Sequence, residues 1–221
     1  MNRFFTYTIP VDDGAAPNPF GSICTLAICK PAIRRTATVG DWVAGFGSKN
    51  APSGDLRGKL VYAMKVTKIC TLAEYDRLAP THWPNKIPDM LSRELCRRLG
   101  DCIYDYSRNP PRQRPGVHGL RNVVKDLRGR NVLISNHFYY FGREAIAIPD
   151  GLKPILHQTQ GHKSRANAPY FDRFVAWITS QGFEMGQLYG WPDYIPSWTG
   201  GCKCTCSARR RTGGNNRESP C

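Results

Sequence analysis

A glycine-rich turn holds the first group of residues that could do chemistry. Residues 40–49 read G-D-W-V-A-G-F-G-S-K, so Asp41 and Trp42 precede the turn and Ser48 and Lys49 end it. Backbone N–H groups freed by glycines can hold a phosphate together with a hydroxyl and an ammonium group. The spacing differs from the Walker pattern, so nucleoside triphosphate hydrolysis is not indicated. A plain hairpin turn with Trp42 in the core is the alternative, and the sequence leaves both open.

The N-terminal quarter supplies a second, dispersed group: Asn18, Phe20, Thr25, Lys30 and Arg34. Prolines on both sides of Asn18 predict an extended segment whose side chains point outward. Arginine can grip a phosphate with two hydrogen bonds, and Asn and Thr can read the edge of a base. In the alternative interpretation Asn18 caps a turn, and Lys30 and Arg34 are solvated.

A third group lies in the C-terminal half. His162 and Lys163 stand side by side in G-H-K-S, where they could shuttle a proton or bind phosphate. Asp41 and His162 are therefore the candidate general acids or bases. Tyr140 belongs to an aromatic run at 138–141 that could stack a base or fill the core.

Other catalytic patterns are missing from the sequence. It has no G-x-S-x-G, H-E-x-x-H, zinc-deaminase or dinucleotide-binding motif. Cysteines such as Cys24 and Cys29 stand in apolar surroundings, which predicts small buried hydrophobic residues. The C-x-C-x-C run at 202–206 does not match the spacing of zinc ligands. The sequence thus predicts no cofactor and no metal.

Hydrophobic periodicity predicts the elements that position these groups. Strands are expected at 3–9, 39–44, 60–67, 132–135, 138–142 and 145–148, whereas 23–29 could be strand or helix. Thr71 and Glu74 form a capping-box pattern that starts a helix. Apolar residues at 171, 174, 175 and 178 predict a final helix over 169–181. A short helix is also expected within 90–99.

Charge indicates the class of partner. Lysine and arginine total 31 against 17 acidic residues, a formal net charge of +14, which favours DNA or nucleotides as ligands. We expect one domain over 1–198, with a basic loop insertion at about 100–130, and a disordered basic tail over 199–221. No apolar run is long enough to span a membrane and no secretory signal is visible, so we expect a cytoplasmic protein in a bacterium or a phage-infected cell.

Several motifs together resemble the family called nucleotide modification associated domain, type two. They are A-P-N-P-F at 16–20, C-T-L-A-I-C-K-P at 24–31, G-D-W-V-A-G at 40–45, L-V-Y-A-M-K-V at 60–66, V-L-I-S at 132–135, G-H-K at 161–163 and F-V-A-W-I at 174–178. The resemblance implies a role beside phage and bacterial systems that modify DNA bases. It nominates Asn18, Thr25, Lys30, Arg34, Asp41, Ser48, Lys49, His162 and Lys163 as site residues.

A looser similarity to the PUA, ASCH and EVE barrels implies an α+β fold. It would be a small, curved, mostly antiparallel sheet or partly open barrel flanked by helices. Three functions remain open: a reader that binds a modified base or nucleotide in a basic cleft, an enzyme that modifies nucleotides or bases, and a non-specific DNA-binding protein. The oligomeric state and the choice of DNA or RNA are not determined.

Overall fold

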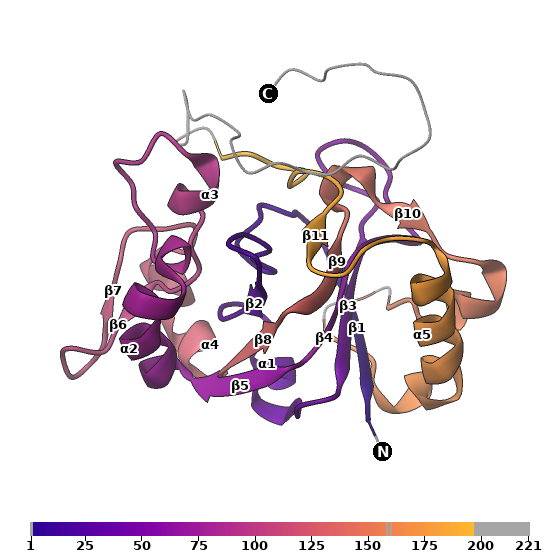
Figure 1. Cartoon of the computed structure of the whole chain (residues 1–221), viewed down its shortest axis with the longest axis horizontal. Helices are drawn as coiled ribbons and strands as arrows, with labels where there is room; N and C mark the ends of the chain where they lie inside the picture. Colours follow the sequence, from indigo (N-terminus) through magenta and orange to yellow (C-terminus); the bar gives the residue numbers. More distant parts are fainter. Residues whose placement is uncertain (1, 158, 160, 197–221) are drawn as a thin grey trace.

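The computed structural model describes residues 2–157, 159 and 161–196. Its main sheet is mixed and open (Figure 1). In spatial order the strands are β1 (Phe4–Ile9), β3 (Trp42–Gly47), β4 (Lys59–Lys65), β9 (His137–Tyr140) and β11 (Gln187–Leu188), with β10 (Ile146–Ala147) paired to β4. The β1–β3 and β9–β11 pairs are parallel and the others are antiparallel. The predicted α+β class is confirmed, and the sheet does not close into a barrel.

A second sheet continues the first. It contains β2 (Cys24–Leu26), β8 (Asn131–Ser135) and β5 (Lys68–Thr71), all antiparallel. Only Val66 and Thr67 separate β4 from β5, and only Asn136 separates β8 from β9. The β4–β9 ribbon therefore passes directly into the β5–β8 ribbon. The ambiguous segment 23–29 forms strand β2 before it turns into α1 (Pro31–Thr36).

The two faces of the main sheet carry different aromatic residues. Tyr7 and Tyr62 lie on one face, where their hydroxyl groups are 2.9 Å apart. A Cβ atom at Gly45 would come within 2.4 Å of Ile9 and 2.6 Å of the Tyr62 ring. Glycine is thus required at position 45 because the side chains of two neighbouring strands fill the space above it.

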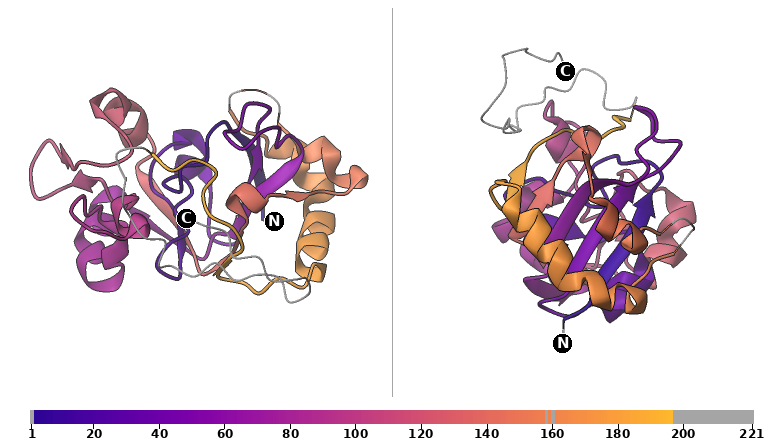
Figure 2. Two further views of the ribbon diagram at one scale, coloured as in Figure 1. Left: turned by 90° about the horizontal axis from the view of Figure 1, so that it is seen from above. Right: turned by 90° about the vertical axis from the view of Figure 1, so that its right-hand side faces the viewer.

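Helix α5 (Phe171–Ser180) covers the other face of the main sheet (Figure 2). It buries Phe174 and Ile178, and the Phe174 ring stacks 4.3 Å from the ring of Phe4. The predicted helix is confirmed. It begins two residues later than expected because η5 (Arg165–Tyr170) adopts 3-10 geometry before it.

Shorter elements gather beside the second sheet, on the far side of the molecule from α5 (Figure 1). They are α2 (Leu72–His82), η1 (Pro84–Lys86), α3 (Leu95–Arg98), β6 (Tyr104–Asp105), β7 (Arg112–Gln113), η2 (Leu120–Asn122) and α4 (Val123–Leu127). The capping box is confirmed: Glu74 N donates to Thr71 Oγ1 at 3.1 Å, and Thr71 N donates to Glu74 Oε2 at 2.7 Å. The short helix expected within 90–99 is the single turn α3.

Two further predictions concern the C-terminal tail and membrane-spanning segments. The predicted basic tail at 199–221 lies outside the described residues. Among the residues that the structure describes, no helix is both long and apolar enough to cross a membrane.

Candidate functional site

Cys29, His118 and Asp126 form a continuous hydrogen-bonded series. The Sγ atom of Cys29 lies 3.3 Å from Nε2 of His118, and Nδ1 of the same ring lies 2.5 Å from Oδ2 of Asp126. The thiol is free. A nucleophile, an imidazole within hydrogen-bonding reach and a carboxylate that orients the imidazole are the parts of a covalent catalytic triad.

Asp126, on α4, organises this series. Its Oδ1 atom accepts a hydrogen bond from the backbone N–H of Cys29 at 3.0 Å. Its Oδ2 atom accepts from the Tyr104 hydroxyl at 3.0 Å and contacts the His118 ring. One buried carboxylate therefore fixes both the backbone that carries the thiol and the imidazole that faces it.

Arg34 stabilises the backbone at Cys29 from inside the core. Its side chain is fully buried, and Nε donates to the carbonyl oxygen of Cys29 at 2.8 Å. The guanidinium group also donates to the backbone oxygens of Asn131 and Asp126. A Cβ atom at Gly129 would lie 2.2 Å from the guanidinium, so this glycine makes room for it. Arg34 is thus a buried residue that holds the backbone of the site in place.

The backbone at the thiol is held in an uncommon conformation. Cys29 has φ of 56° and Lys30 has φ of 38°, both in the left-handed region. For residues other than glycine this region costs about 1–2 kcal/mol per residue. The hydrogen bonds from Cys29 N to Asp126 and from Arg34 to Cys29 O oppose that cost. Strain of this kind is concentrated at functional sites.

The charges around the imidazole favour its protonated form. Burial by itself would lower the pKa of His118, but hydrogen bonds to Asp126 and Cys29 raise it to about 10. For Asp126, burial acts to raise the pKa, and the bond to His118 with its charge brings it below the usual value. At neutral pH the pair is therefore an imidazolium and a carboxylate, and the imidazolium faces the sulfur of Cys29.

Lys30 and His162, both predicted site residues, lie near each other, and Lys30 directly follows Cys29 in the chain. The Nζ atom of Lys30 sits 4.3 Å above the Tyr7 ring and 3.5 Å from the carbonyl oxygen of Gly161. Burial lowers the pKa of Lys30, and its neighbour Cys29 acts in the opposite direction. The pKa of His162 is lowered by burial first, and then by the charges of His157 and Lys30. Packing has thus brought these two predicted residues together.

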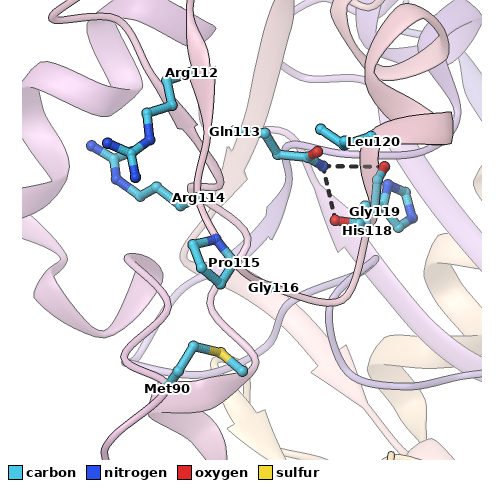
Figure 3. A pocket seen from close by; sticks show the side chains of 9 residues that line it. All are labelled: Met90, Arg112, Gln113, Arg114, Pro115, Gly116, His118, Gly119 and Leu120. Carbon is cyan, nitrogen blue, oxygen red and sulfur yellow. Dashed lines mark hydrogen bonds between the residues drawn. The ribbon is translucent and has the colours of Figure 1, made fainter.

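A hollow of about 430 Å³ adjoins the site (Figure 3). Its lining includes Arg112, Arg114 and His118, and the amide of Gln113 donates to the backbone oxygens of His118 and Gly119. Arg114 is engaged, since its guanidinium lies 2.7 Å from Asp76. Cys29 is not among the residues that line this hollow, so His118 is the member of the hydrogen-bonded series that borders it.

Asn18 and Thr25 belong to a different buried network. Lys86 Nζ donates to Asn18 Oδ1 at 2.6 Å, and Asn18 Nδ2 donates to the Leu99 carbonyl at 2.8 Å. Thr25 Oγ1 donates to Asp101 at 2.6 Å. The prediction that Asn18 points outward is wrong. Its backbone pairs with Thr25 in both directions, which turns the amide into the core.

The remaining predicted residues are dispersed. Asp41 is buried and accepts hydrogen bonds from Arg3 and from the backbone of Thr38. The Trp42 ring packs against Phe174. Phe20 belongs to a core cluster with Leu95 and Leu99. Tyr140 donates to Asp12 at 2.6 Å, and Lys163 donates to the carbonyl oxygens of Pro154 and Leu156. Ser48 donates to the Pro10 carbonyl, whereas Lys49 is exposed. These residues do not share one cleft with Cys29.

The donor groups do not form a metal site in the part of the chain that the structure describes, where no group of three or more His, Cys, Asp or Glu could hold an ion. His118 stands between Cys29 and Asp126 and contacts each with a different ring nitrogen. The three side chains therefore line up in series and do not converge on a point.

Sequence reasoning missed His118 and Asp126. Both fall in the Arg-rich stretch at about 100–130 that was expected to be a basic loop, and which carries β6, β7, η2 and α4. One weak feature of the sequence points to these two residues as a pair. Asp126 is an acid within a strongly basic run, and His118 lies only eight residues before it. The apolar surroundings of Cys29 predict a buried residue, and this prediction is wrong because Cys29 is partly exposed.

A family model described as nucleotide modification associated domain 2 matches residues 1–197, which is most of the chain. No curated protein and no solved structure matches. The match also covers Cys29, His118 and Asp126. The chain belongs to the nucleotide modification associated domain 2 family.

Proposed function

We propose that this protein is an enzyme of nucleotide modification that binds a modified base or nucleotide and uses Cys29 as its nucleophile. The observation that carries the proposal is the unbroken series from the Cys29 sulfur through His118 to Asp126. A thiol is activated when a charged imidazole faces it and a buried carboxylate orients that imidazole. The left-handed backbone at Cys29 and Lys30 supports the same assignment.

The reaction that this series fits is transfer of an acyl group held in amide linkage on a nucleotide. The Cys29 thiolate attacks the carbonyl carbon, a C–S bond forms, and the C–N bond breaks as His118 gives its proton to the departing nitrogen. Water then attacks the thioester while His118 accepts a proton from that water. The C–S bond breaks, which releases a carboxylic acid and restores the thiolate and the imidazolium.

A reader without catalysis has less support. The residues nominated for reading a base include Asn18, Arg34 and Asp41, and the polar groups of all three are occupied by partners within the protein. A ligand would have to displace those hydrogen bonds, which leaves buried groups unpaired at a cost of about 1–3 kcal/mol each. We therefore favour the enzyme, in which these residues hold the site in shape.

Alkylation of the thiols by iodoacetamide tests the proposal, with each cysteine followed by peptide mass spectrometry. We expect Cys29 to react faster than the other free thiols at about pH 6, because its sulfur is partly exposed and faces the His118 ring. Cys70 is the internal control: it is free and buried, and burial raises its pKa to about 11. His118→Gln should slow alkylation of Cys29 by roughly tenfold or more at this pH and leave Cys70 unchanged.

Catalysis is tested with a set of N-acylated nucleotides. We expect release of the acyl group by the wild-type protein, and loss of that release in Cys29→Ser. The proposal would be overturned if Cys29 reacted no faster than Cys70, or if its rate did not depend on His118.

A further inference from the structure

The η2–α4 segment exposes several basic side chains, and its acidic residue is buried. Arg121, Lys125 and Arg128 are exposed and follow at intervals of four and three residues, which places them on one side of the η2–α4 helical segment. Within residues 119–130 the only acidic residue is Asp126, and its side chain is buried toward His118. The positive charge of this surface is therefore not balanced by acids of the same segment.

Helix α1 adds a fourth cation. Arg35 is exposed, and its guanidinium donates to the backbone oxygen of Arg128 at 3.4 Å. Two apolar side chains stand among these cations: Leu120 is 82% exposed and Val124 is 67% exposed. We call this surface, made of Arg35, Leu120, Arg121, Val124, Lys125 and Arg128, the α4 face.

The α4 face borders the thiol site. Asp126 extends inward from α4 to hold His118 and the backbone of Cys29. Lys125, the preceding residue, lies near enough to Lys30 for its charge to lower the pKa of Lys30, after the larger effect of burial. A ligand spread over the α4 face would thus end next to Cys29.

We propose that the α4 face binds a strand of nucleic acid. Its cations contact phosphates, and Leu120 and Val124 contact exposed bases of a single strand. The inference rests on the proposed function and narrows its substrate to a base within a polymer. Phosphates repeat along a strand, so several cations are neutralised at once and their counterions are released. The exposed side chains of Leu120 and Val124 can bury apolar area against the faces of unpaired bases.

Titration of a fluorescent single-stranded oligonucleotide at several salt concentrations tests this proposal. Arg121→Ser combined with Lys125→Ser should weaken binding roughly tenfold and reduce the salt slope by about 1.4, at about 0.7 per lost phosphate contact on a single strand. Leu120→Ser should weaken binding about fivefold with the salt slope unchanged, because it removes an uncharged contact.

The matched control removes equal charge elsewhere. Arg165 and Arg173 are both exposed and lie in η5 and α5, across the main sheet from α4. Arg165→Ser combined with Arg173→Ser should bind as the wild type. Equal losses in both double variants, or equal binding of phosphatidylserine vesicles and oligonucleotide, would overturn the proposal.

The two proposals fail separately. If alkylation of Cys29 depends on His118 but the two double variants bind alike, nucleic-acid binding by the α4 face is wrong. The proposal that Cys29 is a nucleophile is then still supported. If only the α4 double variant loses binding but Cys29 is unreactive, the proposal that Cys29 is a nucleophile is wrong. Nucleic-acid binding by the α4 face is then still supported.

Discussion

Two buried aspartates, Asp101 and Asp126, occupy similar surroundings and support different roles. Each accepts a hydrogen bond from a tyrosine hydroxyl, Tyr75 at 2.7 Å for Asp101 and Tyr104 at 3.0 Å for Asp126. Around Asp101 the network continues through Thr25 to other buried groups. Around Asp126 it continues through a histidine to a thiol at the surface.

The difference lies in where each network ends. Lys86 and Asn18, beside Asp101, are fully buried and use their polar atoms on one another and on backbone carbonyls. A network satisfied in this way fixes the local fold. The network around Asp126 ends at the Cys29 sulfur, which contacts the His118 ring. The Asp101 carboxyl group thus stabilises the fold, whereas in the proposed function the Asp126 carboxyl group orients the ring that faces the Cys29 thiol.

Removing the cation of the first network should give the largest change in stability. Lys86→Met removes the ammonium donor of the Ile23 carbonyl oxygen and of the Asn18 carbonyl and amide oxygens. The two Asn18 oxygens still accept from the N–H groups of Thr25 and Phe20. We expect the free energy of unfolding to fall by about 3 kcal/mol or more, measured by urea denaturation. Lys49→Met, at an exposed lysine, is the control and should stay within about 0.5 kcal/mol of the wild type. If Lys86→Met lost only a little free energy of unfolding, the network around Asp101 would not be the one that stabilises the fold.

A matched pair of substitutions separates the two roles. Asp101→Asn should cost about 1–3 kcal/mol of stability, because an amide N–H₂ then faces the hydroxyl of Thr25 or Tyr75. It should leave alkylation of Cys29 unchanged. Asp126→Asn should slow that alkylation roughly tenfold, since an amide no longer favours the charged imidazole. Equal effects of both variants on alkylation would contradict the division of roles.

A third buried aspartate, Asp12, extends the comparison to the pH dependence of stability. Burial raises the pKa of Asp12 to about 7, although the Tyr140 hydroxyl acts to lower it. The folded protein therefore holds a proton that the unfolded chain has released between about pH 4 and 7, so this group makes stability fall as pH rises through that range. Asp126 has a lowered pKa, so its contribution is lost on acidification.

Urea denaturation at about pH 5 and pH 8 checks these signs. Relative to the wild type, Asp12→Asn should gain about 2–3 kcal/mol between the lower and the higher pH, because it removes the cost of ionising a buried carboxyl. Asp126→Asn should not gain in this way. Parallel behaviour of the two variants would mean that both carboxyl groups titrate alike in the folded protein.

Local patterns were enough to predict most of the elements. Alternating apolar residues gave β1, the Thr71–Glu74 pair gave the start of α2, and apolar spacing gave the buried face of α5. Each of these signals depends on neighbours within a turn or two of the chain. The segment around Asn18 was misjudged because its burial depends on Lys86 and Leu99, which are distant in the sequence.

By itself, the sequence determined the positive charge, the main strands, the buried face of the last helix and the resemblance to a nucleotide modification family. Only the tertiary structure decided which side chains meet. Cys29 lies 89 residues from His118 and 97 from Asp126, so no local spacing relates them. Local pattern fixes the conformation of each segment, whereas the contact between the thiol and the imidazole depends on how α4 packs against the turn after β2.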